Sequence, residues 1–209
     1  MKTFATMLKP LAMSITLLAI FSAGQIAKAD PVTVSGTSSG TITGTAASFL
    51  SFTGNNFTAT TAGGVGSFSG ADRIGTFTLS STASQTPVSG SFMLNLTFTA
   101  PSGINGGQST SYTATISGTI STPNVGGVRI QFDNPIQNFT FSNASGSGFF
   151  AIEMPTVFVQ SGDTANLTAG LTGNQTAAAV PEPATMILLG TGLAGVAAKI
   201  RKRRKNAQD

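Results

Sequence analysis

Few side chains in this sequence could carry acid–base or metal chemistry. The 209 residues include no His and no Cys, so the commonest general base, the commonest metal ligand and every thiolate are missing. Between residues 31 and 179 the charged side chains are Asp72, Asp133, Glu153, Asp163, Arg73 and Arg129. Two carboxylates that face each other across a groove can hydrolyse a glycosidic bond. The sequence alone does not determine how these carboxylates lie relative to one another. Asp133 and Asp163 lie in turns, where Asp normally bonds its own backbone.

No complete catalytic or metal-binding set can be assembled from these residues. Catalysis of this kind needs a base, a nucleophile and an orienting group together. A calcium loop needs a characteristic spacing of Asp and Asn ligands, which the sequence lacks. We therefore expect a protein without enzymatic activity, metal site or cofactor, and a glycoside-active protein is the weaker alternative.

The charge distribution argues against a nucleic-acid partner. The formal net charge is +4, and charged residues make up only 9% of the chain. Almost all basic residues lie at the two ends, whereas the central region is nearly uncharged and slightly acidic. A nucleic-acid-binding protein needs a basic patch on its folded surface.

Two kinds of polar motif recur along the central region. Six Asn-x-Ser/Thr sequons could accept a glycan, at Asn56, Asn95, Asn138, Asn143, Asn166 and Asn174. Thr-x-Thr pairs recur at Thr41/Thr43, Thr58/Thr60, Thr76/Thr78, Thr97/Thr99 and Thr113/Thr115. Both motifs also arise on ordinary strands, because residues i and i+2 share the solvent face and Thr favours strands. The pairs are irregularly spaced and form no solenoid repeat, so an ice-binding face is only a weaker alternative.

Period-two alternation predicts the elements that carry these residues. Strands are expected at 74–80, 92–99, 112–120, 128–133 and 136–141, with further candidates at 32–46, 47–52, 148–153, 156–160 and 164–171. Turn sequences such as Gly63-Gly64 and residues 161–163 separate them. The pattern predicts an all-β protein with a single antiparallel β-sandwich or jelly-roll-like domain at residues 30–173. Residues 174–180 lack periodicity and are interpreted as a linker.

The apolar residues in phase with each strand predict the core. Phenylalanine is its main material, because the chain has 15 Phe and no Trp. The expected members are Phe77, Leu79, Phe92, Leu94, Leu96, Phe98, Ile116, Ile130, Phe132, Phe139, Phe141, Phe150, Val157, Val159 and Leu167. Phe149 beside Phe150 breaks the phase, so one of the two faces outward or marks a bulge. A platform for sugar rings, made of surface Phe side chains or Tyr112, is the alternative for the aromatic residues.

The first 29 residues predict an N-terminal signal helix for export. Lys2 and Lys9 form a charged start, residues 11–21 are apolar, and Ala27 and Ala29 supply the small residues that signal peptidase reads. Cleavage before Asp30 follows. The apolar stretch is about half of the ~20 residues that a spanning helix needs. The Sec translocon and signal peptidase are the partners expected at this end.

The other end of the chain has the order of a sorting signal. Pro181, Glu182 and Pro183 precede an uncharged segment at 184–198, interpreted as a single transmembrane helix, and then a basic tail at 199–205. The basic residues are Lys199, Arg201, Lys202, Arg203, Arg204 and Lys205. The segment reaches only ~22 Å at ~1.5 Å per residue, short of the ~30 Å hydrocarbon core, so flanking residues must help it span. The basic tail stays in the cytoplasm, which places residues 30–180 on the far side of the inner membrane.

This C-terminal order resembles the PEP-CTERM sorting domain of exported bacterial proteins. The resemblance implies that exosortase, a membrane-embedded cysteine protease, recognises Pro181, Glu182 and Pro183 and processes the anchor at residues 181–205. The prolines fix φ and remove N–H donors, so the tripeptide stays extended and open to a protease. The resemblance implies nothing about the domain between the two signals.

Together these observations predict an exported protein that is transiently anchored in the inner membrane and then reaches the cell surface. We expect a cell-envelope or extracellular-matrix protein with a structural or adhesive role in a surface layer or biofilm. The alternative is a carbohydrate-binding module of the exopolysaccharide matrix, which would need an exposed aromatic strip. Exopolysaccharide is the expected partner beside exosortase and the membrane.

Overall fold

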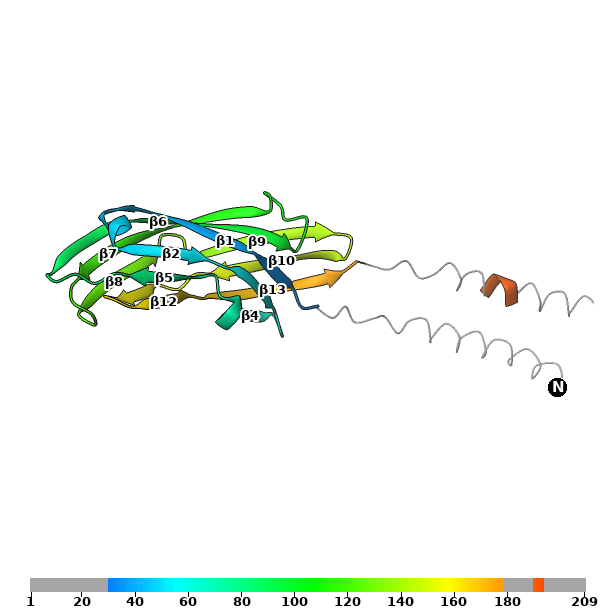
Figure 1. The fold of residues 1–209 in the computed structure, drawn as a ribbon. Helices are drawn as coiled ribbons and strands as arrows, with labels where there is room; N and C mark the ends of the chain where they lie inside the picture. The colour runs from blue at the N-terminus through cyan, green and yellow to red at the C-terminus, as the bar shows by residue number, and fades with distance from the viewer. Residues whose placement is uncertain (1–29, 179–189, 194–209) are drawn as a thin grey trace, which may run out of the picture.

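The structure is a computed structural model that describes residues 30–178 and 190–193, and its described part is an assembly of antiparallel strands (Figure 1). The largest sheet has six strands in the order β11-β8-β7-β6-β1-β3. These are β11 (Val157–Gln160), β8 (Gly126–Phe132), β7 (Ser109–Ile120), β6 (Thr86–Ala100), β1 (Thr33–Gly44) and β3 (Asn56–Thr60). Long strands β1, β6 and β7 form its centre.

Two smaller sheets complete the domain. A four-stranded sheet has the order β4 (Val65–Phe68), β13 (Ala169–Ala177), β10 (Gly146–Glu153) and β9 (Ile136–Asn143). A three-stranded sheet has the order β12 (Thr164–Leu167), β5 (Gly75–Leu79) and β2 (Leu50–Gly54). Two short 3-10 helices, η1 (Thr45–Ser48) and η2 (Gly70–Asp72), lie between strands.

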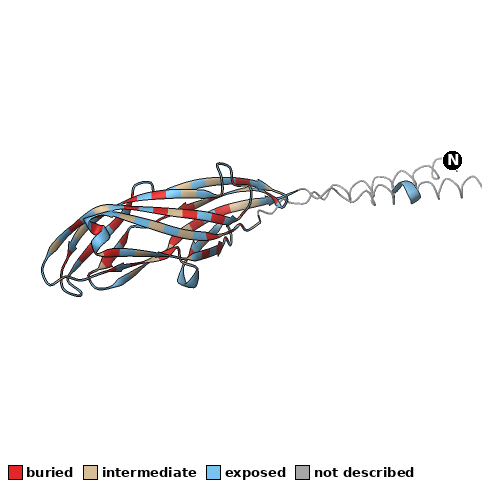
Figure 2. Cartoon of the chain, turned by 45° about the horizontal axis from the view of Figure 1, so that its top comes forward, coloured by how far each residue is buried: buried red, intermediate tan, exposed pale blue. Residues whose placement is uncertain are grey.

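One aromatic core joins the large sheet to both smaller ones. On β6, the ring of Phe92 lies 4.9 Å from the rings of Phe52 and Phe77 in the three-stranded sheet. Six residues further along β6, Phe98 contacts Phe139 and Phe150 in the four-stranded sheet. The six-stranded sheet therefore covers both smaller sheets, which share one buried cluster along the length of the domain (Figure 2).

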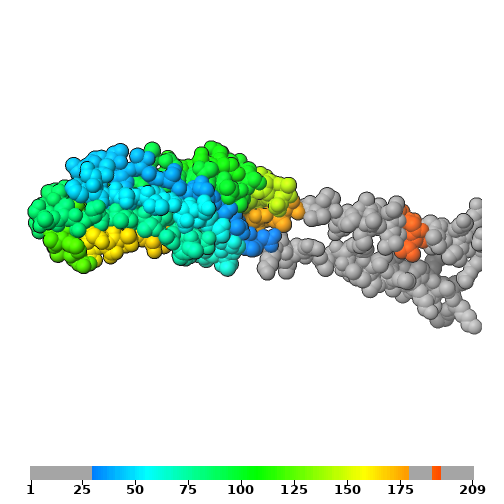
Figure 3. Space-filling model, in the orientation of Figure 1, coloured from blue at the N-terminus to red at the C-terminus, as the bar shows by residue number. Residues whose placement is uncertain are grey.

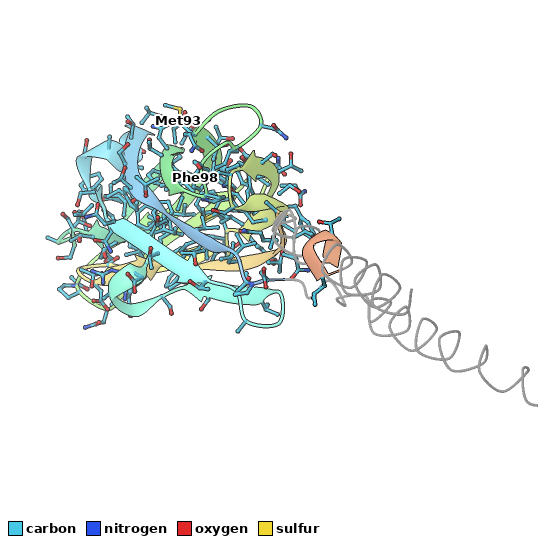
Figure 4. All side chains as sticks on the ribbon, turned by 90° about the vertical axis from the view of Figure 1, so that its right-hand side faces the viewer. Met93 and Phe98 are labelled. Carbon is cyan, nitrogen blue, oxygen red and sulfur yellow. The ribbon has the colours of Figure 1, made fainter. Side chains whose placement is uncertain are left out.

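Alternation along single strands positions this core. On β6, Phe98 is buried, whereas Met93 is 44% exposed on the opposite face (Figure 4). The predicted core residues are buried, except that Phe139 is only partly buried and packs against the cluster. The neighbouring residues Phe149 and Phe150 follow the same alternation. Phe150 is buried, Phe149 is half exposed, and the register of β10 continues through both without a bulge.

The prediction of an all-β antiparallel domain is confirmed, with three differences in detail. The layers contain three sheets, not the two of a simple sandwich. Strands β3 and β4 were not predicted, because their residues are mostly polar or small. Gly63 and Gly64, both with positive φ, lie in the turn that connects the two strands. The candidate at 164–171 is two strands, since β12 ends at Leu167 and β13 begins at Ala169.

The predicted linker at 174–180 begins too early. Strand β13 continues to Ala177, and its last residues pair with β10 as far as Gly146↔Ala177. The missing apolar periodicity misled the prediction, because backbone hydrogen bonds hold this end of the strand whatever its side chains are. The sheet therefore extends beyond the predicted domain end at residue 173.

The two ends of the domain lie side by side. The backbone N–H of Asp30 donates to the carbonyl of Gln175 at 2.8 Å, and the N–H of Gln175 donates back at 3.0 Å. In the space-filling view, the blue start and the orange end of the domain meet at the same tip (Figure 3). Chain entry and chain exit therefore share one end of an elongated domain.

Several predicted features lie outside the described residues. They are the signal peptide at 1–29 with Ala27 and Ala29, the tripeptide Pro181-Glu182-Pro183, the basic tail at 199–205, and all of the predicted transmembrane segment 184–198 except residues 190–193. Within the part of the chain that is described, no helix is long and apolar enough to cross a membrane.

Candidate functional site

The charged side chains considered for catalysis do not converge. Asp72, Asp133, Glu153 and Asp163 are all exposed, and they lie on η2, after β8, at the end of β10 and in the turn before β12. An Asp163 carboxylate oxygen accepts the N–H of Thr164 at 2.7 Å, which is the turn role expected of it. Among residues 30–178 and 190–193, no three metal-ligating side chains gather.

Of the two cations, Arg73 has a local structural role. The Arg73 guanidinium donates to the carbonyl of Gly70 and, through Nε, to the hydroxyl of Thr76, each at 2.9 Å. Arg129 is exposed on β8, opposite Phe158 of β11. Arg73 therefore braces the loop around it.

Tyr112 is not a surface residue, which corrects its interpretation as part of a sugar platform. Its side chain is 1% exposed, and its hydroxyl donates to the carbonyl of Ile152 at 3.3 Å, which ties β7 to β10 across the core. Burial raises the pKa of Tyr112 above its ordinary value. Its position in phase with Ala114 and Ile116 on β7 was the signal that could have placed it in the core.

We expect Tyr112 to stay protonated as the pH rises through about 10 while the domain is folded. The unfolded chain loses its phenol proton first, so the free energy of unfolding falls as the pH rises above about 10. Tyr112 is the only tyrosine and Trp is absent, so the ultraviolet absorbance of tyrosinate reports on this residue alone. An absorbance titration followed together with circular dichroism tests this. Reversible ionisation near pH 10 with native circular dichroism would contradict it.

The sequons lie at the surface of strands and turns. Asn56, Asn138 and Asn166 are exposed, and Asn95, Asn143 and Asn174 are half buried. Asn143 is engaged locally, because its side-chain oxygen accepts the N–H of Ser145 at 2.9 Å and its amide donates to the carbonyl of Ser102. Asn138 and Asn174 lie on the outer face of the four-stranded sheet, on either side of β10.

Four of the five Thr-x-Thr pairs share one surface. The pairs on β1, β3, β6 and β7 all project from the outer face of the six-stranded sheet, and only Thr76/Thr78 lies elsewhere, on β5. The register aligns them in rows, such as Thr43, Ser91 and Thr115. Some hydroxyls bond each other across strands, as Ser35 and Thr99 do at 2.9 Å. This surface is the solvated polar face that strand alternation predicts.

The outer face of the four-stranded sheet is different, because exposed apolar side chains gather on it. Three of the rows that its register forms across the strands carry these side chains. From the β9 edge, the rows are Thr140, Phe149 and Asn174; Asn138, Ala151, Thr172 and Val65; and Ile136, Glu153, Gly170 and Ser67. Val65 is 60%, Phe149 50% and Ile136 48% exposed.

Small residues at the middle of these rows leave a groove. Ala151 and Gly170 form its floor, and the longer side chains of Val65, Ile136 and Asn138 stand around it. The groove has a volume of about 310 Å³. We call it the β10 groove, since Ala151 and Glu153 on the outer side of β10 both line it.

A second depression adjoins the β10 groove. It has a volume of about 410 Å³ and shares Glu153 and Gly170 with the first. Its other lining residues include the hydroxyl side chains of Ser67, Ser69 and Thr168. The Glu153 carboxylate therefore stands where the two depressions meet, with apolar walls on one side and hydroxyl groups on the other.

Sequence reasoning missed this site for two reasons. Strand β4, which supplies Val65 and Ser67, was not predicted, and a strand register cannot be deduced from alternation alone. The one available signal was Phe149, whose break in phase indicated an outward aromatic residue. The described part of the chain lacks the exposed aromatic strip that the carbohydrate-binding alternative would need, because the two half-exposed Phe residues there, Phe149 and Phe158, belong to different sheets.

Comparison with known proteins identifies the C-terminal signal. The family model of the PEP-CTERM protein-sorting motif matches residues 179–204, which confirms the C-terminal resemblance. The motif implies an exported protein that exosortase processes, and it leaves the β domain unassigned. No curated protein and no solved structure matched the chain.

Proposed function

Since the chain carries a PEP-CTERM protein-sorting motif, we propose that it is a cell-envelope or extracellular-matrix protein with a structural or adhesive role. In this proposal the signal peptide at 1–29 is removed, the segment at 184–198 anchors the protein transiently, and exosortase then sorts it to the cell surface. The β domain is the part that remains outside the cell.

The observation that carries the proposal is the position of the sorting motif relative to the domain. The motif begins at residue 179, just after the last strand ends at Ala177, and Asp30 pairs with Gln175 at the same tip. Because the N-terminal and C-terminal residues of the domain lie at the same end, the outer faces of the sheets and the far end of the domain lie away from the anchor. Such an arrangement suits a tethered protein that contacts its surroundings.

The proposal includes no catalytic activity, because the exposed carboxylates lie apart on separate elements. A structural or adhesive role is consistent with the low charge and the extensive hydroxyl surface, which favour contact with uncharged, hydrated partners. A carbohydrate-binding function is the second candidate, and the β10 groove favours it.

Localisation tests the proposal directly. We expect the protein recovered from the matrix fraction of the producing cells to begin at Asp30, because Ala27 and Ala29 form the cleavage pattern. N-terminal sequencing and immunoblots of fractionated cells give both results. Cells without exosortase provide the control, and in them the protein should stay in the membrane fraction.

A chain that keeps Met1, or that stays in the cytoplasm of normal cells, would overturn the export assignment. Deletion of the gene should also weaken the biofilm or surface layer, and a plasmid copy should restore it. An unchanged surface layer with normal localisation would remove the structural or adhesive role and leave the export assignment intact.

A further inference from the structure

We propose that the β10 groove and the depression that adjoins it bind a neutral polysaccharide chain. The inference rests on the proposed function, since a protein of the extracellular matrix meets such chains. It deepens that function by naming the surface, the contacts and the chemical class of the ligand.

The apolar part of the groove fits the carbon face of a sugar ring. Val65 and Ile136 line the groove, are each about half exposed and come from two different strands of one sheet. Phe149 is half exposed on β10 in the row beside the groove. A pyranose ring carries C–H groups on its faces, and an aromatic or branched apolar side chain packs well against them. The small floor at Ala151 and Gly170 leaves room for a ring between these walls.

The polar part of the groove fits the hydroxyl rim of the same ring. Asn138 and Thr172 stand beside Ala151 in the middle row, and Glu153 stands two residues further along β10. An amide both donates and accepts, and a carboxylate accepts two hydroxyl donors at once. Hydrogen bonds to a charged group are stronger than those between neutral groups.

The charge of the site selects a neutral chain. Glu153 is the only charged residue that lines either depression. A chain of uronic acids, or one with phosphate or sulfate groups, would bring negative charge against this carboxylate, and like charges repel. Unsubstituted hydroxyl groups meet no such repulsion.

The two depressions together point to a chain rather than a single sugar. They meet at Glu153 and Gly170, so a ligand that fills the β10 groove continues past the carboxylate toward Ser67, Ser69 and Thr168. Hydroxyl side chains can donate to and accept from the next sugar units. The combined site is an open trough, as a polymer that enters and leaves at both ends requires.

Affinity electrophoresis tests this inference. The extracellular polysaccharide of the producing cells is separated by anion exchange into a neutral and an acidic fraction, and each is cast into native gels. The full chain is run in mild detergent. We expect the neutral fraction to retard it.

Three substitutions probe different parts of the groove. Glu153→Gln removes the charge-assisted acceptor, and we expect binding weaker by about tenfold or more. Ile136→Ala removes an apolar wall, and Ala151→Leu fills the floor without removing any polar group. Phe158→Ala is the matched control, since Phe158 is 58% exposed on β11 of the six-stranded sheet, away from the groove. It should leave binding unchanged, and circular dichroism checks the fold of every variant.

The proposal is supported if the neutral fraction retards the unsubstituted protein and the control variant equally and retards the three groove variants less. No retardation by the neutral fraction, binding to the acidic fraction alone, or equal binding by all variants would overturn it. Failure here is distinct from failure of the proposed function. If the protein reaches the matrix with its mature N-terminus but does not bind the neutral fraction, the proposed function stands and the polysaccharide inference is wrong.

Discussion

Glu182→Ala or Pro183→Ala should leave the full-length protein in the inner membrane. In the proposed sorting, exosortase reads the tripeptide, whereas the apolar segment at 184–198 and the basic tail at 199–205 remain intact in these variants. The precursor should accumulate, and little or no protein should reach the matrix. Immunoblots of membrane, periplasmic and extracellular fractions measure the shift.

Two controls separate recognition of the tripeptide from retention in the membrane. Glu153→Ala changes the only other glutamate of the chain and should leave sorting unaffected. Deletion of residues 201–205 should weaken retention before processing, because it removes the charges that stop a helix too short to span comfortably. The deleted protein should appear partly in soluble fractions. Normal processing of the Ala-substituted tripeptide in cells that contain exosortase would sink the sorting assignment.

Phe92→Ala should be the most damaging single change in the β domain. The Phe92 side chain is fully buried on the central strand β6, and its ring contacts those of Phe52, Phe77 and Phe132. Truncation of a buried Phe costs about 3–5 kcal/mol, out of a typical total of about 5–15 kcal/mol. We expect a large fall in the denaturant midpoint, or a domain that does not fold at 37 °C.

Phe158→Ala is again the matched control, because Phe158 is more than half exposed. Surface substitutions of this kind usually change the free energy of unfolding by less than about 0.5 kcal/mol. Urea unfolding followed by circular dichroism gives both values. If the two variants are equally stable, the packing of the six-stranded sheet against the three-stranded sheet does not depend on the Phe92 ring.

Local patterns predicted the elements of this fold better than their assembly. Alternation on β5, β6, β7 and β8 identified both the strands and their buried faces, because an apolar face every second residue is a property of one strand alone. Strand β3 was missed because only Phe57 and Ala59 alternate there among Asn and Thr. The division into three sheets depends on which strands pair over long separations, and that information is not periodic.

The candidate site lay beyond the sequence for the same reason. Val65, Ala151 and Ile136 come from distant parts of the chain, and only the pairing of β4, β13, β10 and β9 brings them to one face. The sorting signal was the opposite case. Its meaning depends on the order of a few adjacent residues, so the sequence alone predicted it, and the family match at 179–204 confirms it.

The end of β13 also decides how the domain carries a mechanical load. Whenever the chain is held at its C-terminal side, tension on the domain enters at Ala177 and runs along the axis of β13. That strand lies between β4 and β10, and its hydrogen bonds are perpendicular to the pull. Tension along the strand therefore loads its bonds in shear, all together, and does not unzip them one by one. The strand nearest the sorting motif therefore gives way only when several hydrogen bonds break at once.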